Sequence, residues 1–240
     1  MVEVNGARGV WTLTRRVLLA VALAVVVVPA LLMVWSRHRV AASGMQAVVA
    51  ASAAMDYRPS LARLSGDFPY RDVKPRLRGR NVADPSPVPA SLWAVIERLR
   101  QDGGGRHELG VSYLLVGRPK DAMATLEQTL RSATNQRGEL AEAIRRSRDA
   151  ALLNDLAVTY LALDDAALQP PSLEAVQRAW EIDRTPAIAW TRAEVIDSYH
   201  IRERSIAAWR DFLALDPGSQ WSDFAHQRLN DLLKPTNTEL

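Results

Sequence analysis

The residues that could carry out chemistry in this sequence are few and far apart. The four histidines, His38, His107, His200 and His226, form no HExxH pair or other spacing typical of metal ligands. The absence of cysteine excludes disulfides, thiolate metal sites and cysteine nucleophiles. The adjacent acids Asp164 and Asp165 fit a helix end or loop better than an acid/base pair. We therefore predict that the chain is not an enzyme and holds no metal or cofactor.

Glycines and tryptophans also favour structure over chemistry. The run Gly103-Gly104-Gly105 is no phosphate loop, because no Lys-Ser or Lys-Thr pair follows it and no strand is predicted before it. Four tryptophans at helical spacing favour core or hairpin packing, and any that are exposed in a groove would be anchors for a protein partner: Trp180, Trp190, Trp209 and Trp221.

Composition excludes further classes of protein. The chain has 240 residues, of which 48% are hydrophobic and 24% charged, as expected for a folded protein rather than a disordered one. Its formal net charge of +3 is too small to indicate a nucleic-acid partner, which needs a concentrated basic face.

The N-terminal region predicts a membrane anchor. After a short stub, residues 1–16, the chain runs from Val17 to Trp35 without a charge, including Leu18 and Val28. As a helix, this run spans roughly 28 Å, close to the hydrocarbon thickness of a bilayer. We expect a single transmembrane helix at 17–36 in a bacterial cytoplasmic membrane, with the C-terminal domain in the periplasm. A cleaved signal peptide, which would release a periplasmic protein, and a buried soluble helix are the alternatives.

Residues 37–90, here called the strap, differ from the rest of the chain. Residues 40–55 are small and apolar, and either extend the anchor helix or pack on the body. Six prolines between positions 59 and 89 then exclude long helices. A basic stretch within the strap indicates either a solvated loop or contact with anionic lipid headgroups or an acidic partner. The residues concerned are Arg71, Lys74, Arg76, Arg78 and Arg80.

Residues 91–233 predict a series of helical hairpins, followed by a tail at 234–240. Apolar residues recur at helical spacing, with breaks at Gly103, at Gly117-Arg118-Pro119, in a connection containing Pro170-Pro171, and at Asp216-Pro217-Gly218. The last helix has one apolar face, as expected of a terminal cap, and Ser219 is placed to cap its N-terminus. The expected fold is all-α, with αα-hairpins and a C-terminal capping helix.

These hairpins resemble the tetratricopeptide repeat. Leu109-Gly110-x-x-Tyr113 with Ala122 and Leu126 is the best-preserved copy, and in a later copy Ala193 replaces the glycine. Such a resemblance implies a solenoid over residues 91–233. The segments RPSLARLSGDFPY and AAWRDFLALDPGSQW also resemble the region before the caspase-like domain of bacterial CHAT-type proteins. That family's catalytic dyad has no counterpart here.

The function expected from these features is a membrane-anchored protein–protein interaction module, an accessory or scaffold subunit of a membrane complex. A solenoid meets its partner on a curved inner face formed by the first helices of its hairpins. Alternatives are the regulatory half of a split caspase-like peptidase and a structural tether whose groove is filled by residues 40–90 of the chain itself. The candidate partner-binding residues are Glu108, Ser112, Asn154, Trp190, Arg192 and Glu194.

Overall fold

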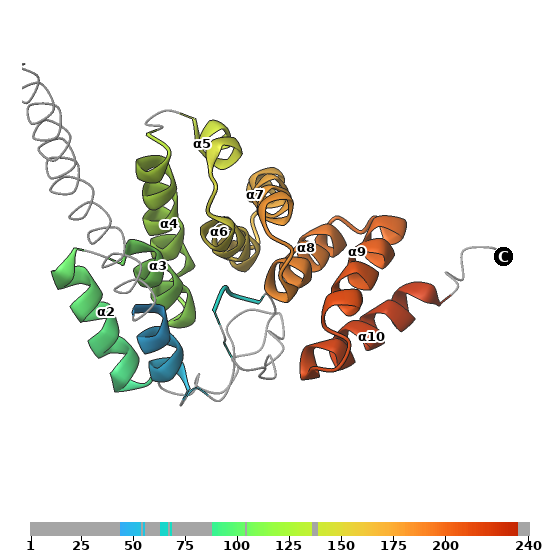
Figure 1. Ribbon diagram of the computed structural model, residues 1–240, viewed down its shortest axis with the longest axis horizontal. Coiled ribbons are helices and arrows are strands. Elements are labelled where there is room, and N and C mark those ends of the chain that lie inside the picture. The colour runs from blue at the N-terminus through green and yellow to red at the C-terminus, as the bar shows by residue number, and fades with distance from the viewer. Residues whose placement is uncertain are drawn as a thin grey trace, which may run out of the picture. The chain divides into compact units, whose positions relative to one another are not determined.

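A computed structural model describes residues 44–53, 55, 63–66, 68, 88–103, 105–135 and 139–234. The secondary structure of these residues is entirely helical (Figure 1), which confirms the predicted all-α class for the described part of the chain. Contacts divide the chain into two compact units, Met1–Ser43 and Gly44–Leu240, and every described residue belongs to the second.

The helices follow one another with short connections. Residues 44–52 are helical. The later elements are α2 (Ala90–Asp102), α3 (Arg106–Leu115), α4 (Pro119–Ala133), α5 (Leu140–Arg146), α6 (Ala150–Leu163), the short 3₁₀ helix η1 (Ala166–Leu168), α7 (Gln169–Ile182), α8 (Pro186–Ser198), α9 (Arg202–Leu215) and α10 (Gln220–Leu233).

Several helix ends follow directly from local sequence. The side chains of Asp149, Thr185 and Ser219 accept hydrogen bonds from the free backbone N–H groups at the starts of α6, α8 and α10. The cap predicted at Ser219 is thus confirmed. Pro170 and Pro171 lie within the first turn of α7 and not in a connection before it. The N–H groups of the first helical positions have no acceptor within the helix. Proline, which lacks an N–H group, therefore costs no hydrogen bond there.

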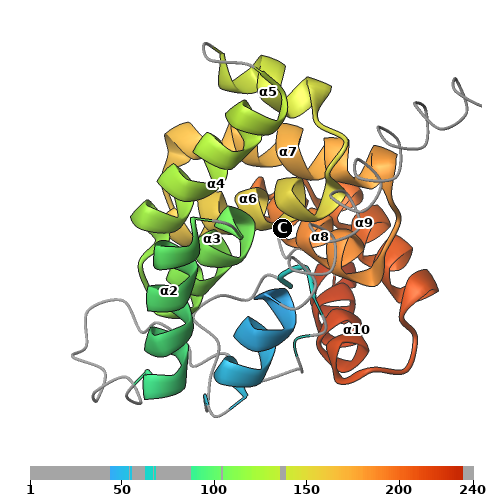
Figure 2. The same ribbon diagram turned by 60° about the vertical axis from the view of Figure 1, so that its left-hand side comes forward.

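Helices adjacent in sequence pack against each other, most extensively in the pairs α3/α4, α6/α7 and α8/α9. Figures 1 and 2 show these pairs standing side by side in chain order, with α10 against α9. The helix of residues 44–52 packs on the body through Val48 and Ala51, together with Leu92 and Val111. Of the two placements expected for residues 40–55, packing on the body is therefore the one observed for 44–52.

Gly110 allows α3 and α4 to approach closely. A Cβ atom built at this position would lie 2.4 Å from Cδ2 and 2.6 Å from Cγ of Leu126, far inside van der Waals contact. Leu126 is fully buried, so it has no open space into which it can move. The motif therefore has glycine at position 110 because a larger residue would overlap the volume that the Leu126 side chain fills.

We expect Gly110→Ala to lower the free energy of unfolding by about 1–3 kcal/mol, the usual effect of overpacking a core. Urea unfolding at equilibrium measures this change. Gly218→Ala is the matched control, because a Cβ at Gly218 meets nothing within 4 Å. The free energy of unfolding of this variant should equal that of the wild type. Equal stability of the two variants would contradict the close-packing explanation.

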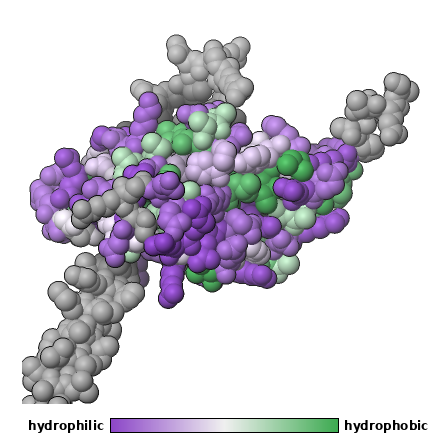
Figure 3. Space-filling view, turned by 90° about the horizontal axis from the view of Figure 1, so that it is seen from above, coloured by the Kyte–Doolittle hydropathy of each residue, from purple (hydrophilic) through white to green (hydrophobic). Residues whose placement is uncertain are grey.

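In the described part of the chain, buried apolar residues form three clusters. One is centred on α4, α6 and α7. A second joins α2 and α3 to Val48, Ala51, Met55, Leu64 and Phe68, and a third is aromatic and joins α8, α9 and α10. Trp190, Trp209 and Trp221 are buried in the third cluster, as predicted, whereas Trp180 is partly buried at its edge. On the face in Figure 3, hydrophilic residues predominate and the hydrophobic ones form separate groups.

The described helices include none whose length and apolar character would suffice to cross a bilayer. The predicted transmembrane helix at 17–36, with Val17, Leu18, Val28 and Trp35, lies outside the described residues, as does the stub 1–16. The five basic strap residues expected to contact lipid also lie outside them: Arg71, Lys74, Arg76, Arg78 and Arg80.

Candidate functional site

A short non-helical part of the strap lies on the surface of α6 and α8. We call residues 63–66 the docked segment; it is drawn in teal beside these helices in Figures 1 and 2. Its partners are distant in sequence, since Asn154 follows Arg63 by 91 positions and Thr191 follows it by 128. Only the folded body brings these groups together.

Two buried side chains bind the backbone of the docked segment at Arg63. The carbonyl oxygen of Arg63 accepts hydrogen bonds from Nδ2 of Asn154 at 3.0 Å and from Oγ1 of Thr191 at 3.1 Å. Both side chains are fully buried. Because every residue type carries this carbonyl, the two contacts recognise main chain and are independent of side-chain identity.

A third buried side chain, Asp155, binds the segment at Ser65. Its Oδ1 accepts the backbone N–H of Ser65 at 2.7 Å, and its Oδ2 accepts the Ser65 hydroxyl. Asn154, Asp155 and Thr191 therefore contact polar groups of two residues of a single segment, Arg63 and Ser65. We call these three residues the main-chain-binding cluster.

The same carboxyl group contacts His107 on α3, with Nε2 lying 2.7 Å from Oδ2 of Asp155. A serine, an aspartate and a histidine thus meet, but Asp155 lies between the other two. In a hydrolytic triad, the histidine stands between serine and acid, where it takes the hydroxyl proton. Here the hydroxyl donates to the carboxyl group instead, so the arrangement holds the segment and does not activate a nucleophile.

The side chain of Arg63 extends toward the C-terminal helices. Its guanidinium lies 2.8 Å from Oδ2 of Asp216 and 5.1 Å from the ring centroid of Trp221. The exposed side-chain fractions are 21% for Arg63 and 15% for Asp216, so the ion pair is largely shielded from water. An ion pair combined with stacking on an indole ring suits the flat guanidinium of arginine.

Apolar residues complete the contact. Leu64 and Phe68 are buried and belong to the cluster that contains Val158 of α6. Gly66 between them has a φ of +106°, which only glycine adopts without strain, and its carbonyl accepts the N–H of Phe68 at 2.9 Å. Leu64 and Phe68, on either side of Gly66, thus pack into the same apolar cluster of the body.

One buried acceptor in the cluster is unsatisfied. Oδ1 of Asn154 has no hydrogen-bond partner among the described residues, whereas Nδ2 of the same amide contacts both the Arg63 carbonyl and, at 3.1 Å, Oδ1 of Asp155. A buried acceptor without a donor is unfavourable by about 1–3 kcal/mol. The docked segment therefore leaves one acceptor of the main-chain-binding cluster, Oδ1 of Asn154, without a hydrogen bond.

The pKa of His107 is raised above its ordinary value. Burial of the imidazole opposes the charged form, but the hydrogen bond and the negative charge of Asp155 outweigh it, and Asp149 and Glu108 act in the same direction. Protonated His107 is therefore more stable in the folded protein than in the unfolded chain.

Because the folded-state pKa exceeds the unfolded one, we expect His107 to stabilise the fold fully below about pH 6.5 and progressively less as the pH rises through its folded pKa. Urea unfolding of the wild-type and His107→Gln chains at several pH values between 5.5 and 8.5 measures this. The difference between the two should shrink as the pH rises. A pH-independent difference would contradict the assigned ion pair.

The predicted partner-binding residues occupy different environments, and partner binding by them stays a prediction. Asn154 belongs to the main-chain-binding cluster, whereas Ser112 is fully buried and donates to the carbonyl of Glu108. The buried Glu108 side chain lies beside Gly44, where the first described helix begins. Trp190 is 1% exposed within the aromatic cluster, so a partner has no access to it in this fold.

The two remaining candidates face other helices. Arg192 pairs with Asp211 of α9 at 2.9 Å and lies over the ring of Trp180. Glu194 is partly buried, and burial together with the charge of Asp197 raises its pKa to about 8, opposed by Arg228. Neither contacts the docked segment in a hydrogen bond or ion pair that the structure shows for the described residues.

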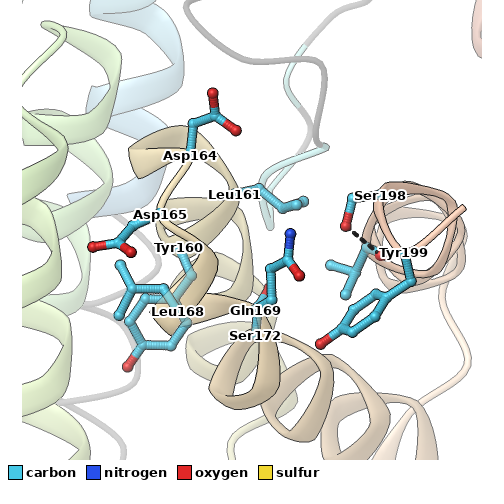
Figure 4. A pocket seen from close by; sticks show the side chains of 10 residues that line it. Tyr160, Leu161, Asp164, Asp165, Leu168, Gln169, Ser172, Ser198 and Tyr199 are labelled. Atoms are coloured by element: carbon cyan, nitrogen blue, oxygen red, sulfur yellow. Dashed lines mark hydrogen bonds between the residues drawn. The ribbon is translucent and has the colours of Figure 1, made fainter.

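Asp164 and Asp165 lie at the rim of a small pocket of about 40 Å³, between α6, η1, α7 and α8 (Figure 4). Their carboxyl groups point in different directions in this view. Asp164 ends α6 with a φ of +51°, and Asp165 caps η1 by accepting the N–H of Ala167. Both therefore act at helix ends, as predicted, and the pocket has room for only a few water molecules.

Sequence reasoning missed Asp155, Thr191 and Asp216 as site residues. A signal existed for Asp155, because it stands beside Asn154 in the mainly apolar run of α6, and buried acids need partners. No local signal identifies Thr191 or Asp216, whose contacts depend on where residue 63 lies.

A comparison of the chain with protein-family models, with curated proteins and with solved structures finds no match. The resemblance to the tetratricopeptide repeat and to the CHAT-type region therefore stays a prediction.

Proposed function

We propose that this protein is a non-catalytic interaction module, in which a tetratricopeptide-like solenoid binds a non-helical segment of a partner on the surface of α6 and α8. In this proposal α3/α4, α6/α7 and α8/α9 are the hairpins and α10 is the capping helix. The observation that supports it most directly is the main-chain-binding cluster, which binds a carbonyl, an N–H group and a hydroxyl of one segment.

The chemistry of the cluster is suited to peptide binding. Contacts within the body also orient the cluster, because Asp155 contacts His107 of α3 and accepts a hydrogen bond from Nδ2 of Asn154, and neither contact involves the docked segment. Pre-oriented groups lose little conformational entropy on binding, which favours affinity. The segment of this chain itself, bound there in the structure, supplies an example of the ligand class.

The proposal includes attachment to a membrane, which rests on the uncharged run from Val17 to Trp35. A membrane-bound module searches for its partner over a surface, so a modest affinity suffices. Sodium carbonate extraction of cells producing the full chain tests the attachment. Retention in the membrane pellet is expected, and release with the peripheral proteins would contradict it.

Selection from a random peptide library displayed on phage tests the binding function. The target is the detergent-solubilised full chain, and bound peptides should be lost when Asp155→Ala is the target instead. Arg145→Ala is the control, because its side chain is 55% exposed and pairs with Glu142 far from the cluster, so peptide binding should persist. Failure to select any peptide sensitive to Asp155→Ala, both with the wild-type chain and with a variant whose own docked segment is released, would overturn the proposed function.

A further inference from the structure

Three consecutive side chains of the docked segment each meet a different environment. The guanidinium of Arg63 is placed between Asp216 and the ring of Trp221, Leu64 is buried in an apolar cluster, and Ser65 donates twice to Asp155. A main-chain site alone would accept any sequence. These three environments add a requirement for particular side chains.

The first environment favours arginine over lysine. The contact combines a carboxyl oxygen at 2.8 Å with an indole ring whose centroid lies 5.1 Å from the guanidinium carbon. A flat, weakly hydrated guanidinium satisfies both at once, whereas an ammonium group is compact and more strongly hydrated. The ligand position that corresponds to residue 63 is therefore selective for arginine.

The other two environments are as restrictive. Leu64 is 5% exposed, so its position needs an aliphatic side chain that matches this space. At the position of Ser65, the backbone N–H lies 2.7 Å from Oδ1 of Asp155, which excludes proline, and a carboxylate there would be repelled by Asp155. A small side chain with a hydroxyl group can donate to the other carboxyl oxygen of Asp155, Oδ2, as Ser65 does.

The unsatisfied Oδ1 of Asn154 indicates a ligand better than the present one. This buried acceptor belongs to the amide group whose Nδ2 binds the Arg63 carbonyl, and it has no donor among the described residues. A partner segment whose backbone N–H reached it would form every contact of the docked segment and one more. The segment of the chain itself is therefore a ligand that a partner can replace.

From these contacts, and resting on the proposed function, we propose that the site recognises an Arg–aliphatic–Ser sequence in a partner protein and that Arg63-Leu64-Ser65 is its intramolecular competitor. The competitor is tethered, so its effective concentration is in the millimolar range. A partner binds only when its local concentration is higher than this effective concentration, or when its extra contacts give it a higher affinity than the tethered segment has. The strap thus sets a threshold for partner binding.

The test measures binding of a fluorescent peptide with the sequence of residues 58–70 to the detergent-solubilised full chain, by anisotropy. The wild-type chain is compared with the double variant Arg63→Ala/Ser65→Pro, which removes the ion pair and the N–H donor but keeps Leu64 and Phe68. We expect the double variant to bind the peptide about tenfold more tightly than the wild type, because its own segment no longer competes. Adding Asp155→Ala to the double variant should abolish binding.

Peptide variants test the recognised sequence. Replacement of the peptide arginine that corresponds to Arg63 by lysine or alanine should weaken binding to the double variant, more strongly for alanine. Proline in place of the serine that corresponds to Ser65 should abolish binding. Circular dichroism verifies that the double variant is folded. If it is not, Ser65→Glu serves as the opening variant, since its carboxylate would face that of Asp155.

The outcomes separate this inference from the proposed function. Equal affinity of the wild-type and opened chains for the peptide, or indifference to the arginine, overturns the inference. If peptides without Arg–aliphatic–Ser are selected from the library and depend on Asp155, the inference is wrong but the binding function stands. If no peptide of any sequence binds the opened chain, the proposed function falls as well.

Discussion

Replacement of Trp190 by alanine should lower the free energy of unfolding by about 3–5 kcal/mol, the usual range for an aromatic residue removed from a core. The Trp190 ring is 1% exposed and lies at the centre of the aromatic cluster. Its centroid is 5.1 Å from that of Trp209, 4.7 Å from Trp221 and 5.4 Å from Phe224, so one side chain connects α8, α9 and α10. The cavity left by alanine cannot close without moving three helices.

Thermal unfolding followed by circular dichroism measures this effect, and the midpoint should fall by roughly 10 °C. Trp93→Ala is the matched control, because Trp93 on α2 is 43% exposed and its removal should change stability little. A similar loss in both variants would show that Trp190 does not have the connecting role assigned to it. Peptide binding should also weaken in Trp190→Ala, since Trp221 stacks on Arg63.

Replacement of Asp155 by alanine should release the docked segment and destabilise the fold by about 3–5 kcal/mol, as expected when one partner of a buried polar network is removed. Asp155 is fully buried and interacts with Ser65, His107 and Asn154. Alanine leaves their donors without this acceptor, and those that stay buried are each unfavourable. When the segment is released, water can accept the hydrogen bonds of its freed donors, so release lowers the cost of these unpaired groups.

Limited proteolysis with trypsin detects the release, because cleavage after Arg63 requires an accessible backbone. We expect Asp155→Ala to be cut there much faster than the wild type under conditions where α3–α10 stay intact. Asp211→Ala is the control, since Asp211 is 50% exposed and its ion pair with Arg192 should contribute at most about 1 kcal/mol. Unchanged cleavage after Arg63 in Asp155→Ala would show that the segment is held by other contacts.

Local sequence was sufficient for the helical part of the fold. Apolar spacing placed a helix at 91–102, where α2 covers Ala90–Asp102, and the stop at Asp216-Pro217-Gly218 separates α9 from α10 as expected. The cap at Ser219 was predictable because it depends on groups within a few residues. Pro170-Pro171 misled the prediction, since proline both ends helices and begins them.

The stretch AAWRDFLALDPGSQW shows how far such reasoning extends. Its two tryptophans were predicted to pack in the core or between hairpins. Trp209, Phe212 and Trp221 are buried in the cluster that joins α8, α9 and α10, so the stretch is a seam between helices. Periodicity could not show that Asp216 and Trp221 also receive the Arg63 guanidinium. A structural seam therefore also forms part of the candidate site.

The sequence by itself determined the all-α class, the breaks at Gly103, Gly117-Arg118-Pro119 and Asp216-Pro217-Gly218, and the close approach at Gly110. These features depend on residues near each other in the chain or on one side chain's volume. Only the tertiary structure decided that residues 63–66 lie on α6 and α8. Their partners follow Arg63 by 91, 128 and 153 positions, and hydrogen bonds over such separations leave no periodic signal. These hydrogen bonds form because the packed helices contain buried polar side chains that need partners, and the docked segment of the strap supplies those partners.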